Sequence, residues 1–419
     1  MQILHVTPYF APSWAYGGPP RSIFELCREL VRRGQDVTVL TTDAYDERRR
    51  ARPGQETLDG IVVVRLPNFS NNLAWHRQLF LPKGTARFLR DRVHNFDIIH
   101  LHMYRTLQGL TVRREALRAG IPYVFSARGS LPVIVRRHAT KAFFDAMFGS
   151  RVLRDAAELV ALSGAERKQY EAMGVPSSKV TIVFNGIDSE SFSRPRPRRL
   201  FAKRHGLDGK RVVTYLGRLD ARKGLEHLLR AFREVKASAQ DTVLVLAGPD
   251  AGSRPRLEKL ARLLSISSSV VFPGFVTGAE KLQVYDDSDV IVYPGFHEVF
   301  GLVPFEALAC GKPIVVSDDS GCGEIVRDAR AGFTVPFGDE SRWSRAIIAA
   351  LDGGQQVEEM IRRGQSFVRE KLSWQASAAA TELVYGKALA GSDYHYGRGR
   401  YPGSSVRLLP SPPLADTRR

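Results

Sequence analysis

The sequence has 419 residues, 43% of them hydrophobic, which is enough for two globular cores. Its 61 Lys and Arg against 44 Asp and Glu give a formal charge of +17, so we expect an anionic partner. Nucleic acid, nucleotide-sugar, polyphosphate lipid and acidic bilayer all fit that charge. Three scattered cysteines argue against disulfides and zinc and favour a reducing cytosol. No apolar run of roughly 18 residues is present, and residues 1–6 are typical of a strand rather than of a signal peptide.

The first half begins with a strand, a glycine- and proline-rich loop, a helix and a second strand. Residues 3–7 predict the first strand, and apolar residues at helical spacing between Ile23 and Val31 predict the helix. The Gly17-Gly18 pair before this helix would let backbone N–H groups approach a diphosphate closely, although a plain strand–helix turn is the alternative. The strict dinucleotide-binding fingerprint is absent, so no nicotinamide cofactor is implied.

Further apolar runs predict strands at residues 61–66, 97–101, 158–163 and 180–184, and a strand from Tyr123 that ends in the Arg128-Gly129 loop. His100 and His102 are two residues apart, so both side chains should lie on one face of a strand end. A metal pair would need a third ligand, and none is evident in the sequence. We therefore favour a polar strand end close to a cleft.

A basic and aromatic stretch, residues 136–153, combines Arg136, Arg137 and Lys141 with Phe143, Met147 and other apolar residues. Such an amphipathic stretch could lie on an anionic membrane surface, or it could pack on its own domain. Residues 189–205 then form a polar connector with Pro195 and Pro197. We predict domains at residues 1–190 and 191–372, a closing helix over 373–390 that returns to the first domain, and a disordered or loosely attached tail over 391–419.

The second half repeats the strand–loop–helix order. A strand over residues 211–216 is followed by Arg218 and Lys223, five residues apart, ahead of a helix with Leu225 and Phe232. A guanidinium fork and an ammonium charge at this spacing can reach one diphosphate. The alternative is that both are surface charges beside a helix.

The central stretch of the second half covers residues 290–317. It predicts a strand, a loop that holds Glu298, a helix that begins at Gly301 and Leu302, and a further strand. Ligands bind at the carboxyl edge of open α/β sheets, and a helix N-terminus attracts phosphate. Glu298 and Glu306 would both stand at this edge.

The spacing Glu298-x7-Glu306, followed by Ala-Leu-Ala-Cys-Gly-Lys-Pro, resembles the signature of the family 4 retaining glycosyltransferases of GT-B fold. The resemblance covers roughly residues 1–390. It implies an α/β protein with two Rossmann-like domains whose parallel sheets face each other across a cleft, and a C-terminal helix that crosses back. The implied reaction is retaining, metal-independent and cofactor-free hexosyl transfer from a UDP- or GDP-sugar to a glycan or polyprenyl-linked acceptor, in surface polysaccharide biosynthesis.

The resemblance also implies roles for individual residues. Arg218 and Lys223 would neutralise the leaving diphosphate, and Glu298 would orient the donor sugar; these three are the expected catalytic residues. Glu306 would accept hydrogen bonds from the ribose. The remaining expected substrate-binding residues are Gly17, Gly18, His102, Arg128, Phe300, Gly301 and Leu302.

Arg128 departs from the family pattern, because many relatives carry a histidine before the glycine there. An arginine would offer a fixed cation to a phosphate or acidic group. Two other readings stay open: a different GT-B reaction such as nucleotide-sugar epimerisation, and a non-enzymatic basic module that binds nucleic acid or membrane. We expect no nucleic-acid partner and a cytoplasmic location, peripheral on the inner face of the membrane if the basic stretch binds lipid.

Overall fold

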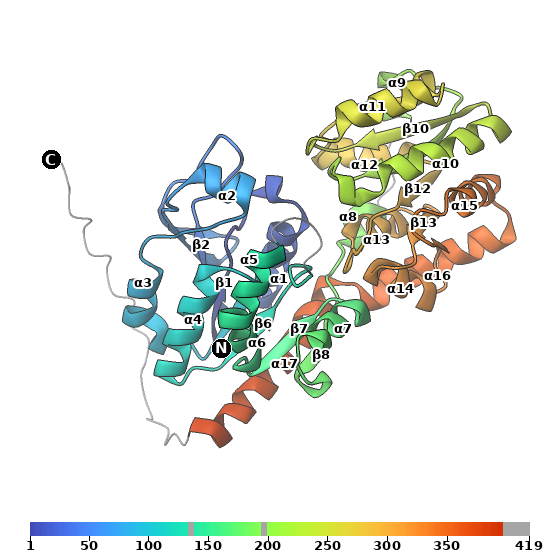
Figure 1. Cartoon of the computed structure of the whole chain (residues 1–419). Helices are drawn as coiled ribbons and strands as arrows, with labels where there is room; N and C mark the ends of the chain where they lie inside the picture. The colour runs from blue at the N-terminus through green and yellow to red at the C-terminus, as the bar shows by residue number, and fades with distance from the viewer. Residues whose placement is uncertain (133–137, 194–198, 397–419) are drawn as a thin grey trace.

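The computed structural model describes residues 1–132, 138–193 and 199–396, and it forms two lobes, each built on a sheet covered by helices (Figure 1). Both sheets are parallel apart from one edge pair, as the predicted α/β class requires. The predicted polar connector, residues 189–205, was wrong in part, because its described ends form helices α8 (Ser189–Ser193) and α9 (Leu200–Arg204), and Phe192 and Phe201 are buried in the core of the second lobe. Its prolines Pro195 and Pro197 and the arginines Arg194, Arg196 and Arg198 fall outside the described residues. Arg136 and Arg137 of the basic stretch fall outside them too.

Within the described residues, the first sheet has eight strands in the order β3-β4-β2-β1-β5-β6-β7-β8. They are β1 (Gln2–Val6), β2 (Asp36–Thr42), β3 (Gly54–Leu58), β4 (Ile61–Leu66), β5 (Ile98–His102), β6 (Tyr123–Ser126), β7 (Glu158–Ala161) and β8 (Val180–Ile182). Strand β3 was missed from the sequence, because its residues are polar and mostly exposed at the antiparallel edge. The other strands were predicted to within about two residues.

The helices of this lobe connect the parallel strands. They are α1 (Gly18–Arg32), α2 (Asn71–Arg77), α3 (Thr85–Arg92), α4 (Leu107–Ala119), α5 (His138–Phe144), α6 (Ser150–Arg154) and α7 (Gly164–Ala172). The predicted helix α1 is present, but it begins at Gly18, so the second glycine of the predicted loop belongs to the helix. Pro19 stands in its first turn, where a missing N–H costs little, and Ile23, Leu26 and Leu30 are buried against the sheet.

The second sheet has six parallel strands among the described residues, in the order β11-β10-β9-β12-β13-β14. They are β9 (Arg211–Leu216), β10 (Thr242–Ala247), β11 (Val270–Gly274), β12 (Val290–Tyr293), β13 (Ile314–Ser317) and β14 (Phe333–Val335). These runs are almost continuously apolar, because helices cover both faces of a parallel sheet. The helices of this lobe are α8 (Ser189–Ser193), α9 (Leu200–Arg204), α10 (Leu225–Ser238), α11 (Arg254–Leu263), α12 (Gly278–Asp287), α13 (Leu302–Ala309), α14 (Gly321–Asp328), α15 (Glu340–Asp352) and α16 (Gln355–Lys371).

The closing helix α17 (Trp374–Tyr396), red in Figure 1, returns to the first lobe. Its residues Trp374, Ala378 and Tyr385 are buried in one apolar cluster with Ile3 and Ile23. The helix was expected to end near residue 390, and that prediction was wrong: residues 391–396, assigned to the tail, continue it. A glycine at Gly391 costs a helix only about 1 kcal/mol relative to alanine, so it does not stop the helix.

Direct contacts join the lobes beside this helix. The Glu324 carboxylate on α14 accepts hydrogen bonds from the N–H groups of Gly164 and Ala165, at 3.0 and 2.7 Å, and so caps α7 from the other lobe. A methyl group added at Gly18 would lie 3.7 Å from Leu302 Cδ1. The carboxyl ends of β1 and β12 therefore face each other. None of the described helices is long and apolar enough to cross a bilayer.

Candidate active site

Two loops of the second lobe bring Lys223 and Glu298 into contact, although they are 75 residues apart in the chain. Lys223 follows β9 and Glu298 follows β12, and these strands are neighbours in the sheet. The Lys223 ammonium donates to Glu298 Oε1, and the two side chains are 15% and 22% exposed. The Tyr293 hydroxyl lies 3.3 Å from Glu298 Oε2. Burial and the Glu298 charge raise the pKa of Tyr293, so this hydroxyl keeps its proton and donates.

Arg218 lies at the same edge and is held by Asp220, with 3.1 Å between Nη2 and Oδ2. Burial of Asp220 opposes ionisation, but hydrogen bonds from Arg222 and the charges of Arg222 and Arg218 outweigh it and lower the pKa of Asp220 to about 2. The charge of Arg218 also reaches Tyr9 of the first lobe, where it opposes the rise in pKa caused by burial. Arg218 is 37% exposed, so its guanidinium is accessible to an anion.

Helix α13 begins beside these groups. Gly301 precedes the helix with φ of 72°, and a methyl group there would lie 2.9 Å from the Tyr293 ring, so the turn requires glycine. No side chain among the described residues caps the first turn. The Phe300 side chain is 2% exposed and packs on Phe305, with 4.8 Å between ring centroids, so any contact of Phe300 with a substrate would come from its backbone.

Glu306 lies on α13 but is 3% exposed. Its Oε2 accepts hydrogen bonds from Tyr285 Oη at 2.5 Å and from Lys281 Nζ at 2.6 Å. Among the described residues, no hydrogen bond to Oε1 is present. Lys281 was not singled out from the sequence, because it stands alone on α12 and belongs to no motif.

The first lobe faces this edge with the loop that follows β1. Gly17 has φ of 100° and precedes α1, and Gly18 faces Leu302. A cavity of about 420 Å³ lies close by, between the lobes. It is lined by Ala165, Lys168 and Gln169 of α7, with Pro132, and by His297, Glu298, Val299, Asp318, Asp319, Ser320, Gly321, Glu324 and Arg327 of the second lobe. The predicted residues Arg218, Lys223, Glu298, Gly301 and Leu302 thus converge at one edge, opposite Gly17 and Gly18.

Two glycosyltransferase family models match this chain. A model described as "Glycosyl transferase 4-like domain" matches residues 17–186, and one described as "Glycosyl transferases group 1" matches residues 198–367. The chain belongs to the group 1 glycosyltransferases. It is therefore an enzyme, which rules out the alternative of a non-enzymatic basic module.

Curated glycosyltransferases resemble this enzyme over most of its length. An uncharacterized glycosyltransferase from Methanocaldococcus jannaschii is 27% identical, with 89% of this chain and 96% of that protein aligned. A D-inositol 3-phosphate glycosyltransferase from Corynebacterium diphtheriae is 28% identical, with 96% and 97% aligned. A glycogen synthase from Mycobacterium tuberculosis is 25% identical, with 89% and 93% aligned.

Solved structures share the fold of this glycosyltransferase. HepE from Anabaena, in complex with UDP and glucose, has a TM-score of 0.72 at 18% identity, with 92% of this chain and 99% of that chain covered. Sucrose-phosphate synthase from Thermosynechococcus elongatus has a TM-score of 0.75 at 21% identity, with 93% and 100% covered. The predicted GT-B fold is confirmed.

In this glycosyltransferase, Arg128 and His102, both expected to bind substrate, are buried in the first lobe. Arg128 is 8% exposed and His102 is fully buried. The Arg128 guanidinium donates to His102 Nδ1 at 3.1 Å, to Ser22 Oγ at 3.1 Å and to Asn185 Oδ1 at 3.0 Å. In this conformation the cation is engaged by polar groups of its own lobe rather than presented to the cleft.

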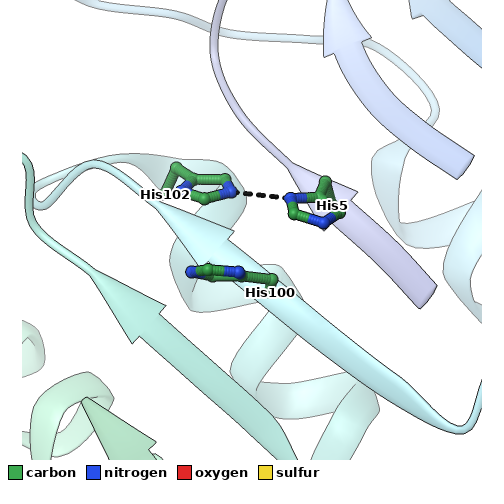
Figure 2. Close-up of side chains that lie close together, drawn as sticks. All are labelled: His5, His100 and His102. Carbon is green, nitrogen blue, oxygen red and sulfur yellow. Dashed lines mark hydrogen bonds between the residues drawn. The ribbon is translucent and has the colours of Figure 1, made fainter. Parts of the chain in front are cut away.

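His102 is also part of a three-histidine cluster. His5, on β1, lies beside His100 and His102 of the neighbouring β5 (Figure 2), and ligand atoms of all three lie within 4.8 Å of one another. The inference that no third ligand is near the histidine pair was therefore wrong. His5 is 95 residues from His100, and only the pairing of β1 with β5 brings the two together.

The hydrogen bonds determine which ring nitrogen of each histidine carries the proton. Arg128 can only donate, so His102 Nδ1 accepts and His102 Nε2–H donates to His5 Nδ1 at 2.9 Å. His5 Nε2–H then donates to Tyr385 Oη at 3.3 Å, and Tyr385 donates to His100 Nδ1 at 2.7 Å. His100 Nε2–H donates to Ser126 Oγ at 2.7 Å. All six ring nitrogens have partners, so a metal ion would have to displace these bonds.

The three histidines are neutral in the folded state. Burial, aided by the charge of Arg128, lowers the pKa of His5 to about 3. Burial likewise lowers the pKa values of His100 and His102, and neighbouring histidines and Arg128 add to the effect. Tyr385 belongs to α17, so this chain of hydrogen bonds also ties the closing helix to the first sheet.

The depressed pKa predicts a pH-dependent stability that His5→Gln should reduce. Between pH 6.5 and about 3, unfolded His5 binds a proton that folded His5 does not, so stability falls as pH falls. From pH 8 to pH 5 the free energy of unfolding should fall by about 2 kcal/mol less in the variant than in the wild type. Urea unfolding at both pH values measures this. Equal pH dependence in the two proteins would contradict a neutral His5.

Proposed function

We propose that this glycosyltransferase moves a hexosyl group from a nucleoside-diphosphate sugar to a glycan or polyprenyl-linked acceptor, with retention of anomeric configuration. The observation that carries the proposal is the Lys223–Glu298 pair beside the open N-terminus of α13. A cation held by a carboxylate next to free N–H donors suits a pyrophosphate. HepE of the same fold is solved with UDP and glucose and with UDP-glucose, which supports a UDP-sugar donor. A GDP-sugar is the alternative.

Charge neutralisation at the leaving group is the main task of the proposed site. Lys223 would turn from Glu298 to the pyrophosphate, and Arg218 and the N–H groups of Gly301 and Leu302 would bind its other oxygens. We propose that these groups suffice without a metal ion or cofactor. Glu306 Oε1 would accept a hydrogen bond from the ribose, while Lys281 and Tyr285 hold the carboxylate in place.

The bond changes proposed take place on one face of the donor sugar. The bond between the anomeric carbon and the diphosphate oxygen breaks as the acceptor hydroxyl forms the new bond, and the hydroxyl proton passes to the departing phosphate oxygen. Glu298, released by Lys223, would orient the sugar and stabilise positive charge at the anomeric carbon. The acceptor would enter from the first lobe beside Gly17 and Gly18.

To reach an acceptor that is attached to a lipid carrier, the enzyme needs a surface that binds the membrane. In the stretch after residue 137, the side chains of Phe143, Met147 and Phe148 are 63%, 48% and 41% exposed, close in sequence to Lys141. Arg151 is exposed further along the chain. We propose that this surface rests on an anionic bilayer in the course of surface polysaccharide biosynthesis, with the enzyme on the cytoplasmic side.

The catalytic proposal predicts that Lys223→Ala lowers kcat/KM about 100- to 1000-fold, because one charged donor to the leaving group is lost. Transfer from radiolabelled UDP-glucose and GDP-mannose measures this, after a thermal-shift panel has selected the donor. Lys210→Ala, an exposed lysine before β9, is the matched control and should keep full activity. Near-normal turnover in Lys223→Ala would contradict the role, and a labelled epimer of the donor would indicate a different reaction.

The membrane proposal predicts that the double variant Phe143→Ser, Met147→Ser floats with phosphatidylglycerol vesicles about tenfold less than the wild type, since two exposed apolar side chains are lost. Leu263→Ser is the matched control, because Leu263 is 72% exposed on the second lobe. Equal flotation of the double variant and the wild type would count against this surface.

A further inference from the structure

A second cavity, of about 240 Å³, lies in the first lobe next to the loop that follows β1. Four arginines and one acidic residue are in its lining: Arg49, Arg50 and Arg52 from the connection between β2 and β3, Arg65 from β4, and Glu56 from β3. Neither the family models nor the proposed transfer mechanism gives these residues a role.

Arg65 occupies a position where the strand pattern calls for an apolar residue. Ile61, Val63 and Arg65 alternate along β4 and are all buried, and the first two pack in the core against α1. The Arg65 side chain is only 2% exposed. A guanidinium at a core-facing position is costly unless its donors are satisfied. Breaks of this kind in the strand pattern are expected at functional sites.

The donors of Arg65 are only partly satisfied. Its Nε donates to Glu56 Oε1 at 2.6 Å, and its Nη2 donates to the carbonyl oxygen of Ala11. Its Nη1 is buried and has no hydrogen-bond partner among the described residues. Arg65 lines the cavity, and a buried donor without a partner costs free energy that a bound acceptor atom would offset.

The other charges around the cavity leave an excess of positive charge. Arg49 pairs with Asp46 at 2.6 Å, and Arg50 pairs with Asp43 at 2.7 Å. Arg52 is exposed and forms no ion pair within the described part of the chain. Four arginines therefore face three carboxylates: among the described residues Arg52 has no carboxylate partner, and Arg65 Nη1 is a buried donor without a hydrogen bond. An oxyanion, phosphate or carboxylate, satisfies both.

We infer that this cavity binds the phosphate or carboxylate group of an anionic acceptor. Arg65 contacts Ala11 in the loop that continues to Gly17 and Gly18, opposite Leu302, so the cavity adjoins the acceptor side of the cleft. Its volume is below the roughly 300 Å³ typical of sites for whole drug-sized ligands, and it suits a charged group better than a complete sugar nucleotide. That the anion belongs to the acceptor rests on the proposed function; that the cavity binds an oxyanion does not.

Calorimetric titration of the full chain with inorganic phosphate, farnesyl phosphate and glucuronate tests the site. The titrations use the Lys223→Ala variant, so that anions bound at the donor site do not contribute. Arg52→Gln and, separately, Arg65→Met should each raise Kd roughly 10- to 100-fold, because a charge-assisted hydrogen bond is lost. Arg87→Gln on α3, 86% exposed in the same lobe, is the matched control and should leave Kd unchanged. Arg52 lies in an exposed loop, so the test stands even if Arg65→Met unfolds.

The anion that binds best identifies the source of the bound group. Tightest binding of farnesyl phosphate indicates an acceptor on a lipid carrier, and tightest binding of glucuronate indicates an acidic sugar. Binding of inorganic phosphate alone indicates a free ion. In transfer assays with Lys223 intact, Arg52→Gln should raise KM for an anionic acceptor at least about tenfold and leave KM for its neutral analogue unchanged. Equal anion affinity in Arg52→Gln and Arg87→Gln, or no anion binding at all, would overturn the inference. Anion binding that depends on Arg52 in a protein that fails to bind any nucleotide-sugar would retain the cavity and refute the proposed function.

Discussion

The ion pair between Lys223 and Glu298 is the contact on which the proposed chemistry depends. It exists because β9 and β12 are neighbours in a parallel sheet, so the loops at their carboxyl ends meet although they are far apart in the chain. In this pair each charge offsets the desolvation of the other. A pyrophosphate can replace Glu298 as the partner of Lys223, which leaves Glu298 free to face the sugar. Donor binding and the release of Glu298 would then be one event.

The opposite wall of the cleft is held by a different kind of interaction. Arg128 orders a chain of hydrogen bonds through three neutral histidines to Tyr385 and Ser126. Since Tyr385 lies on α17, this network also joins the first sheet to the closing helix. Glu324 adds a contact between the lobes by capping α7. These contacts hold the first lobe's side of the cleft in place, whereas the second lobe carries the charges proposed to bind the donor.

Patterns among residues that are close together in the sequence predict much of the fold and of the candidate site. The strands, the helix start at Gly301 and the convergence of Lys223 with Glu298 follow from apolar periodicity and from the rule that parallel strands share a carboxyl edge. What could not be predicted depends on pairings between distant segments. His5 joins His100 only through strand pairing, and Arg65 is exceptional only once β4 is known to be half buried. Strand β3 could not be predicted from apolar residues, because it lies at an exposed edge of the sheet and its residues are mostly polar.

A crystal structure of the full chain with bound UDP, and separately with GDP, is the most direct test of the central claim. We predict that the β-phosphate lies about 3 Å from Leu302 N and from Lys223 Nζ, with Lys223 turned away from Glu298. We also expect the Arg128 network to be unchanged. A diphosphate bound elsewhere, with the Lys223–Glu298 pair intact, would contradict the account.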